Sequence, residues 1–222
     1  MIYIANDVES AGSKLGVHST LSWGACVIAR EELSFNEYFN RRLVFYAELQ
    51  PDSWLYEMEA MKVACSQLMF KQKVFVSRSF LPHAALANPL DVDSSEFDPT
   101  LLLNTMMSYC EHPMVAVNRF NAWMEEVKKE FKDEKVTGVT DTVFFDGGRV
   151  DELLSKYSNK PSPYGHSGLD LDSVYRGYAK RADAKLKELG VPDERTKPHR
   201  ADHDAVYLAQ IGRELLFKKM GW

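Results

Sequence analysis

Residues 2–9 of the chain, Ile-Tyr-Ile-Ala-Asn-Asp-Val-Glu, are the stretch from which the fold is inferred. Apolar residues alternate along it, a pattern typical of a β-strand with one face in a hydrophobic core. The strand ends on Asp7 and Glu9, and residues two apart in a strand point to the same face of a sheet. Two adjacent carboxylates repel each other unless a cation lies between them, and hard oxygen ligands favour Mg²⁺ or Mn²⁺. The pair alone fits two ordinary turn acids equally well.

The rest of the chain alternates predicted strands and helices, with no internal repeat and no convincing domain boundary. Residues 2–8, 20–30 and 35–48 predict a three-stranded meander, and residues 136–145 predict a further strand. The economical interpretation is one α/β domain over residues 1–222, with a mixed sheet flanked by helices. Helices are predicted at 54–68, from Pro99, from Pro113 through a charged stretch, at 148–157, at 172–189 with Asp172 or Ser173 as cap, and at 202–219.

The composition is that of an ordinary soluble globular protein, with 45% hydrophobic and 27% charged residues among 222. No apolar stretch is long enough to span a bilayer, and the first ten residues lack the basic region of a signal peptide. Cys26, Cys65 and Cys110 are odd in number and widely spaced, which argues against a disulfide framework and a structural zinc site. We therefore expect a cytoplasmic or otherwise intracellular protein in a reducing compartment, without a membrane partner.

The net charge of −5 argues mildly against a high-affinity, non-specific coat on nucleic acid, because such binding depends on neutralising phosphates. It argues less against an enzyme whose bound cations supply the local positive charge.

Asp146 is a second candidate ligand. It follows the β-rich run 136–145 and precedes Gly147, Gly148 and a predicted helix. A carboxylate at the carboxyl end of a strand, where the chain turns into a helix, is where open α/β sheets form their sites. A helix N-cap explains the same residue equally well.

The third candidate region reads His199-Arg-Ala-Asp-His-Asp204. A histidine about one helical turn from a carboxylate is close enough to share a site with it, and histidine is the side chain best suited to take a proton near neutral pH. A surface histidine beside an exposed acid is the alternative. His203 is a weaker candidate for the base, and Asp202 fits a helix cap or first-turn acid.

Taken in order, the D-x-E pair, the mid-chain Asp146 and His199-x-Ala201-x-x-Asp204 resemble the DEDDh 3′–5′ exonuclease superfamily, which includes polymerase proofreading subunits, ribonuclease T and oligoribonuclease. The resemblance covers nearly the whole chain. Residues 20–25 (TLSWGA) are similar to the family's second strand. Residues 164–173 (YGHSGLDLDS) are similar to the segment that ribonuclease T-like members place between the second and third motifs, where the acid usually caps a helix.

The resemblance implies a ribonuclease H-like fold and a two-metal hydrolase. Asp7, Glu9, Asp146 and Asp204 would hold two Mg²⁺ or Mn²⁺ ions about 4 Å apart, one activating a water and one stabilising the leaving 3′-oxygen. His199 would take the proton of that water. The expected substrate is the 3′ end of single-stranded DNA or RNA, and the expected products are nucleoside 5′-monophosphates.

The resemblance also implies substrate contacts from apolar and aromatic side chains, which hold terminal bases in a sequence-tolerant way. Core packing is the alternative for the larger side chains. Arg149 and Arg200 flank the candidate site and are candidates for phosphate contacts. The candidates for base contacts are Ser10, Gly12 and Leu15 after the first strand, and Trp54, Met58 and Met61 on the first predicted helix.

Several alternatives stay open at this level. No motif identifies a pocket for the 2′-hydroxyl that distinguishes RNA from DNA. Ribonuclease T-like relatives are often homodimers, which makes a homodimer an expectation for this chain. A non-catalytic nucleic-acid-binding module, or a subunit associated with a polymerase or helicase, would keep the same fold. Residues 69–97 are interpreted as a loop or lid insertion, where such a docking surface would lie.

Overall fold

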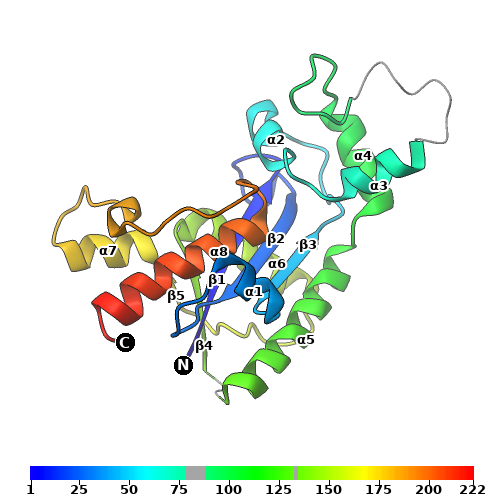
Figure 1. Cartoon of the computed structure of the whole chain (residues 1–222). Helices are drawn as coiled ribbons and strands as arrows, with labels where there is room; N and C mark the ends of the chain where they lie inside the picture. Colours follow the sequence, from blue (N-terminus) through cyan, green and yellow to red (C-terminus); the bar gives the residue numbers. More distant parts are fainter. Residues whose placement is uncertain (79–88, 133–134) are drawn as a thin grey trace.

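A five-stranded mixed sheet forms the centre of the computed structural model, which describes residues 1–78, 89–132 and 135–222 (Figure 1). The strand order is β3-β2-β1-β4-β5. β1 and β2 are antiparallel, as are β2 and β3, whereas β1–β4 and β4–β5 are parallel. This arrangement confirms the expected meander joined to parallel strands. The strands are β1 Ile2–Ser10, β2 Thr20–Val27, β3 Val44–Glu48, β4 Val136–Thr140 and β5 Gly168–Asp170.

Helices cover both faces of this sheet (Figure 1). None of the described helices is long and apolar enough to cross a bilayer. The α-helices are α1 Phe35–Asn40, α2 Met58–Ala64, α3 Phe70–Arg78, α4 Pro99–Tyr109, α5 Pro113–Phe131, α6 Gly148–Tyr157, α7 Leu171–Ala179 and α8 Ala201–Gly212. The chain also has a 3₁₀ turn, η2 Leu186–Leu189, and two π-helical segments, η1 Val143–Gly147 and η3 Arg213–Lys219.

Two neighbouring residues of β2, Trp23 and Gly24, show how α5 and α8 pack on opposite faces of the sheet. Trp23 is fully buried, and its ring centroid lies 4.2 Å from that of Phe120 on α5. Gly24 points to the other face, because successive strand residues alternate. A Cβ at Gly24 would lie 2.0 Å from the carbonyl oxygen of Ala201, the first residue of α8. The first turn of α8 therefore reaches the sheet only because Gly24 has no side chain, and Gly24 pairs with Asp7 of β1.

A second hydrophobic cluster lies under the loop that follows β1. It joins residues of that loop and of β2 to α2, α3, α4 and the segment before α4. Residues 79–88 of the expected loop or lid lie outside the described residues. Of the flanking parts, Phe70–Arg78 is helical, and Leu90 is buried in this cluster. The buried members are Ala11, Leu21, Met61, Ala64, Cys65, Leu68, Phe70, Val74, Leu90, Leu102, Leu103 and Met106.

The strand predicted over 35–48 is wrong in its first half, because residues 35–40 form α1. Ser34 and Glu37 form a capping box, in which the Ser34 backbone N–H donates to Glu37 Oε2 at 2.7 Å. The chain then turns through Arg42 in the left-handed region (φ 57°), and β3 begins at Val44. The capping signal outweighs the β-propensity of the aromatic residues that follow.

Three other predicted boundaries need correction. The helix expected at 54–68 is shorter and spans α2 only. The strand expected at 136–145 ends at Thr140, and η1 follows it. The helix expected at 172–189 ends at Ala179, and its cap is Asp170, which accepts a hydrogen bond from the Ser173 backbone N–H at 2.6 Å. The helices expected from Pro99, from Pro113, at 148–157 and near 202–219 are confirmed.

Candidate active site

Asp7 and Glu9 lie near the end of β1 and point to the face of the sheet that α8 covers. Glu9 is 13% exposed, and its Oε1 faces the imidazole of His199. Asp7 Oδ2 is buried and accepts no hydrogen bond from any residue that the structure describes. A buried carboxylate oxygen without a donor is unfavourable, and a bound cation would satisfy it.

Asp146 reaches the same place from η1, which follows β4. Because β4 pairs in parallel with β1, η1 begins beside the end of β1. The Asp146 side chain is buried there. Asp146 Oδ1 accepts a hydrogen bond from the Val8 backbone N–H at 3.2 Å, and Oδ2 accepts one from the Thr142 hydroxyl. Asp146 is therefore fixed directly to the residue between Asp7 and Glu9.

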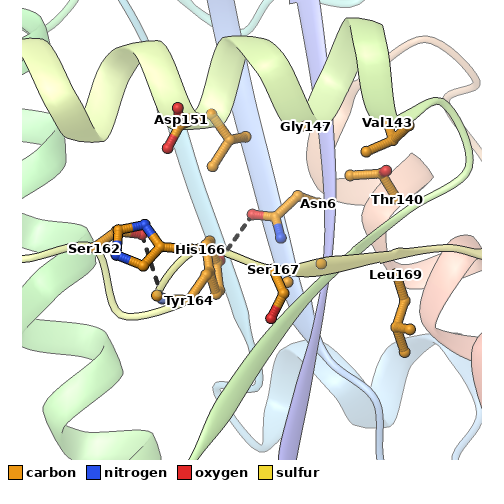
Figure 2. Close-up of a pocket in the computed structure, with 14 residues that line it drawn as sticks. Asn6, Thr140, Val143, Gly147, Asp151, Ser162, Tyr164, His166, Ser167 and Leu169 are labelled. Carbon is orange, nitrogen blue, oxygen red and sulfur yellow. Dashed lines mark hydrogen bonds between the residues drawn. The ribbon is translucent and has the colours of Figure 1, made fainter.

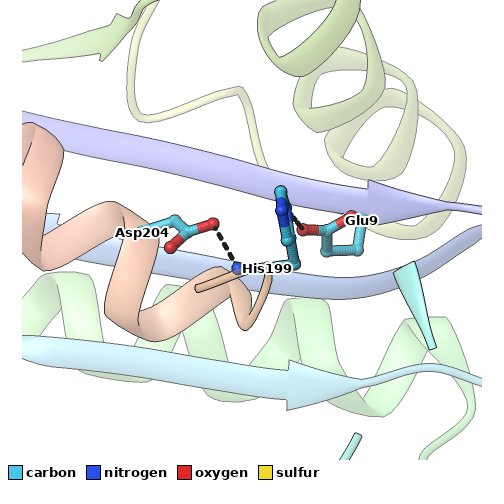
Figure 3. A group of neighbouring side chains, drawn as sticks. All are labelled: Glu9, His199 and Asp204. Carbon is cyan, nitrogen blue, oxygen red and sulfur yellow. Dashed lines mark hydrogen bonds and ion pairs between the residues drawn. The ribbon is translucent and has the colours of Figure 1, made fainter. Parts of the chain in front are cut away.

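Asp204 and His199 approach from the start of α8 (Figure 3). Asp204 Oδ1 accepts a hydrogen bond from Arg195 Nη1 at 2.9 Å, and Oδ2 accepts one from the His199 backbone N–H at 3.0 Å. His199 Nδ1 lies 3.8 Å from Glu9 Oε1. Each of Glu9, His199 and Asp204 offers one ligand atom, and these atoms lie within 4.8 Å of one another.

Like charges and burial act together on the four carboxylates. Burial raises the pKa of Glu9 to about 8, with further contributions from Asp204 and Asp146. Burial and then the charges of Asp146, Glu9 and Asp204 raise the pKa of Asp7 well above its ordinary value. Burial raises the pKa of Asp146 to about 6, and it also raises the pKa of Asp204 against the opposing effect of Arg195.

These features fit a divalent cation site. All four carboxylates supply hard oxygen atoms, one of those atoms has no hydrogen-bond donor, and their negative charges destabilise one another. The residues expected to hold metal thus meet near the carboxyl end of β1, the central strand, and they come from three segments far apart in the chain.

The residues expected to contact substrate lie in two different environments. The Ser10 hydroxyl is buried and donates to the Gly12 carbonyl at 2.8 Å, and Gly12 packs against the ring of His18. Met61 is fully buried in the second hydrophobic cluster. Leu15 and Trp54 are about half exposed and offer apolar surface to solvent.

The two arginines expected near phosphate are engaged elsewhere. Arg149 is buried, and its guanidinium donates to the carbonyls of Gly12 and His18 at 2.6 and 2.8 Å. Arg200 forms an ion pair with Asp202 in the first turn of α8. Arg149 thereby fixes the loop after β1, which places Leu15 against Gly148 beside η1.

His203 does not face the carboxylates. Its ring is buried against Phe35 and Phe39, with centroid distances of 4.8 and 5.6 Å, and burial lowers its pKa to about 4. A residue that the sequence did not single out, Arg195, is instead bonded to Asp204. One sequence signal for Arg195 was Asp193, two residues before it. At that spacing an aspartate in a loop can pair with the arginine and hold its side chain in place.

A separate cavity of about 280 Å³ lies on the opposite face of the sheet, between α6, β4, β5 and the loop before β5 (Figure 2). Asn6 lines it, and Asn6 alternates with Asp7 along β1. The Tyr164 hydroxyl donates to Asn6 Oδ1 at 3.0 Å, and Trp23 Nε1 donates to the same oxygen at 3.2 Å. Asn6 and Asp7 therefore point to opposite faces of the sheet, so this cavity and the Asp7 carboxylate lie on different sides of β1.

No protein-family model matches the chain. In sequence, it is 26% identical over 215 residues to the 3′–5′ DNA exonuclease Cap18 of Escherichia coli, a match that covers 96% of this chain and 89% of that protein.

Solved structures share the fold. The nuclease domain of 3′hExo, a DEDDh family member bound to rAMP, matches with a TM-score of 0.60 at 13% identity, over 99% of this chain and 94% of that one. Cell-death related nuclease 4 matches with the same TM-score and identity, and E. coli exonuclease I in complex with a dA16 oligonucleotide matches with a TM-score of 0.53 at 13% identity. These matches cover 99% and 98% of this chain, which spans 64% and 41% of those two proteins. The chain is thus similar in sequence to a 3′–5′ DNA exonuclease, and it shares its fold with nucleases that include a DEDDh family member.

Proposed function

We propose that the protein is a metal-dependent 3′–5′ exonuclease that removes nucleoside 5′-monophosphates from the 3′ end of single-stranded DNA. The observation that carries the proposal is the convergence of Asp7, Glu9, Asp146 and Asp204 beside the imidazole of His199. The sequence relative named as a DNA exonuclease favours DNA over RNA as the substrate. A single-stranded end is expected, because the terminal phosphodiester has to reach carboxylates that are largely buried.

In this proposal, Asp7, Glu9, Asp146 and Asp204 would hold two Mg²⁺ or Mn²⁺ ions. Bound divalent cations supply a water of lowered pKa and stabilise the oxygen that leaves phosphorus. The four carboxylates carry four negative charges, which two divalent cations balance. Hydrogen bonds from Val8 and Thr142 fix the orientation of the Asp146 carboxylate for this role.

His199 is the proposed general base. Its side chain is 57% exposed, so an attacking water reaches it, and Nδ1 lies 3.8 Å from Glu9 Oε1. The Nδ1 edge of the ring faces Glu9, and Nε2 is the proposed acceptor of the proton from the water. The oxygen of the water bonds to phosphorus as the bond from phosphorus to the 3′-oxygen breaks. The 3′-oxygen then takes up a proton, so the shortened strand ends in a 3′-hydroxyl.

Leu15 and Trp54 are the proposed apolar contacts for the terminal bases. Both are about half exposed, and Leu15 packs against Gly148 directly after η1, which carries Asp146. Trp54 is held in place by its indole N–H, which donates to Asn104 at 3.0 Å. An aromatic face fixed in this way suits stacking that tolerates any base.

The remaining parts of the proposal concern the whole molecule. We infer a single exonuclease domain over residues 1–222 and a reducing, intracellular compartment, in which Cys26, Cys65 and Cys110 stay free as they are in the structure. A homodimer is the expected assembly, and light scattering coupled to gel filtration measures it directly.

The test is a side-by-side digestion of matched single-stranded DNA, single-stranded RNA and duplexes with 3′ overhangs, in Mg²⁺ or Mn²⁺, with products sized to the mononucleotide. We expect mononucleotides from the single-stranded DNA, and none with Asp146→Asn or with chelator. If all substrates stay intact while the protein still binds them, the chain is a non-catalytic nucleic-acid-binding module. Faster digestion of RNA would reject the proposed preference for DNA but keep the exonuclease.

A further inference from the structure

Arg195 lies in the loop between η2 and α8 and donates to the candidate metal ligand Asp204. Its Nη1 is 2.9 Å from Asp204 Oδ1, and its side chain is 21% exposed. Asp193 anchors the same guanidinium through Nε and Nη2, at 2.8 and 2.7 Å. The guanidinium also lies over the ring of Tyr207, 4.5 Å from its centroid. Two contacts independent of Asp204 therefore hold this positive charge at the site.

Both oxygens of Asp204 have a hydrogen-bond donor in this arrangement. Arg195 occupies Oδ1, and the His199 backbone N–H occupies Oδ2. A divalent cation bound to Asp204 would therefore lie close to a guanidinium. The two positive charges repel each other strongly, because Asp204 is only 11% exposed and water screens them little.

We propose that Arg195 is a tethered cation that neutralises Asp204 in the metal-free enzyme and competes with the divalent metal for that carboxylate. The inference rests on the proposed function, since it takes Asp204 as a metal ligand. When the metal binds, the guanidinium leaves Asp204 and stays attached through Asp193 and Tyr207. Arg195 therefore stabilises the fold without metal and raises the metal concentration at which the site fills.

The competing explanation is that Arg195 orients Asp204 for the metal and stays bonded to it afterwards. Partners that orient a ligand strengthen metal binding, and their loss weakens it by about 10–100-fold. A competing cation acts in the opposite direction. The sign of the change in metal affinity therefore separates the two explanations.

The experiment compares Arg195→Gln and Arg195→Lys with the wild-type chain by calorimetric titration with Mn²⁺ and by thermal unfolding in EDTA. Arg181→Gln is the matched control, because Arg181 pairs with Glu188 and Asp183 rather than with the four carboxylates. We expect Arg195→Gln to bind Mn²⁺ roughly tenfold more tightly and to unfold at a lower temperature in EDTA. Arg195→Lys keeps the charge and should bind Mn²⁺ within about threefold of the wild type, as should Arg181→Gln.

Unchanged or weaker Mn²⁺ binding by Arg195→Gln overturns the proposal, even if the wild type digests DNA normally. Unfolding in EDTA at the wild-type temperature also overturns it, because Arg195 would then not stabilise the metal-free site. If the wild type itself binds no Mn²⁺, the proposed function fails, and this inference fails with it. The outcomes thus distinguish failure of the arginine's role from failure of the nuclease assignment.

Discussion

The backbone N–H of His199 donates to Asp204 Oδ2 at 3.0 Å, so one contact ties the proposed base to a proposed metal ligand. His199 adopts a left-handed backbone conformation, with φ of 63°. Such a conformation is uncommon for a residue with a side chain and persists where the surroundings over-determine it. Here the Asp204 carboxylate holds the turn, which directs the imidazole towards Glu9.

Replacing His199 by Asn should lower kcat by about 10²–10⁴-fold, because the proton of the attacking water loses its acceptor. Stability should change little, since the side chain is more than half exposed. The measurements are kcat at saturating Mn²⁺ and the Mn²⁺ affinity by calorimetry. A variant that cleaves at the wild-type rate would remove His199 from the mechanism.

His203→Ala is the matched control and should behave in the opposite way. The ring is buried against Phe35 and Phe39, so its removal should reduce the free energy of unfolding by about 1–3 kcal/mol. At a temperature where the variant is folded, kcat should stay within a few fold of the wild type. Loss of the chemical step in this variant, with normal stability, would instead make His203 the base.

Asp7→Asn should make the metal-free protein more stable and the enzyme inactive. Burial and the neighbouring carboxylates disfavour a negative charge at Asp7, and asparagine places an uncharged amide of the same shape there. Thermal unfolding in EDTA should shift to a higher temperature, and Mn²⁺ should no longer raise it. Asp172→Asn is the control and should keep both activity and metal response, because Asp172 is a half-buried acid paired with Arg176 on α7.

The pKa of Glu9 is 4.5 ordinarily and about 8 in the folded protein. The free energy of unfolding of the metal-free protein should therefore fall as the pH rises from about 4.5 to about 8. An acid whose pKa is raised by folding binds more protons in the folded state, so deprotonation favours unfolding. Denaturant titrations across this range in EDTA should show the decline, and Glu9→Gln should flatten it. Mn²⁺ should stabilise the protein more at pH 8 than at pH 5, because metal binding requires the deprotonated carboxylates. Equal stabilisation at both values would contradict the assignment of Glu9 as a ligand.

Gly24→Ala should displace the start of α8 and reduce activity. Its Cβ would meet the backbone of Ala201 and Asp202 at 2.0–2.5 Å, and backbone atoms at that distance have to move. We expect a loss of about 3 kcal/mol in the free energy of unfolding, together with lower kcat, since α8 carries Asp204. Gly177→Ala on α7 is the control, because its added Cβ has no described atom within 4 Å beyond its chain neighbours and the backbone of its own helix. It should be neutral or stabilise by up to about 1 kcal/mol.

Much of the local structure follows from short-range signals in the sequence. Pro99 and Pro113 each open a helix as expected, because proline is favoured in the first helical turn. The wrong prediction of a strand over residues 35–40, which form α1, also comes from short-range signals. The capping pair Ser34 and Glu37 is visible in the sequence, but the aromatic residues after it favour a strand more strongly when propensity alone is weighed.

The sequence by itself determined the types of residue at the candidate site and their order along the chain, namely Asp7, Glu9, Asp146, His199 and Asp204. Only the tertiary structure decided that these side chains meet, that His203 turns into the core and that Arg195 joins Asp204. The physical reason is that strand and helix signals act over a few neighbouring residues. Distances between segments depend instead on how β1 pairs with β4 and on how closely α8 packs over a glycine.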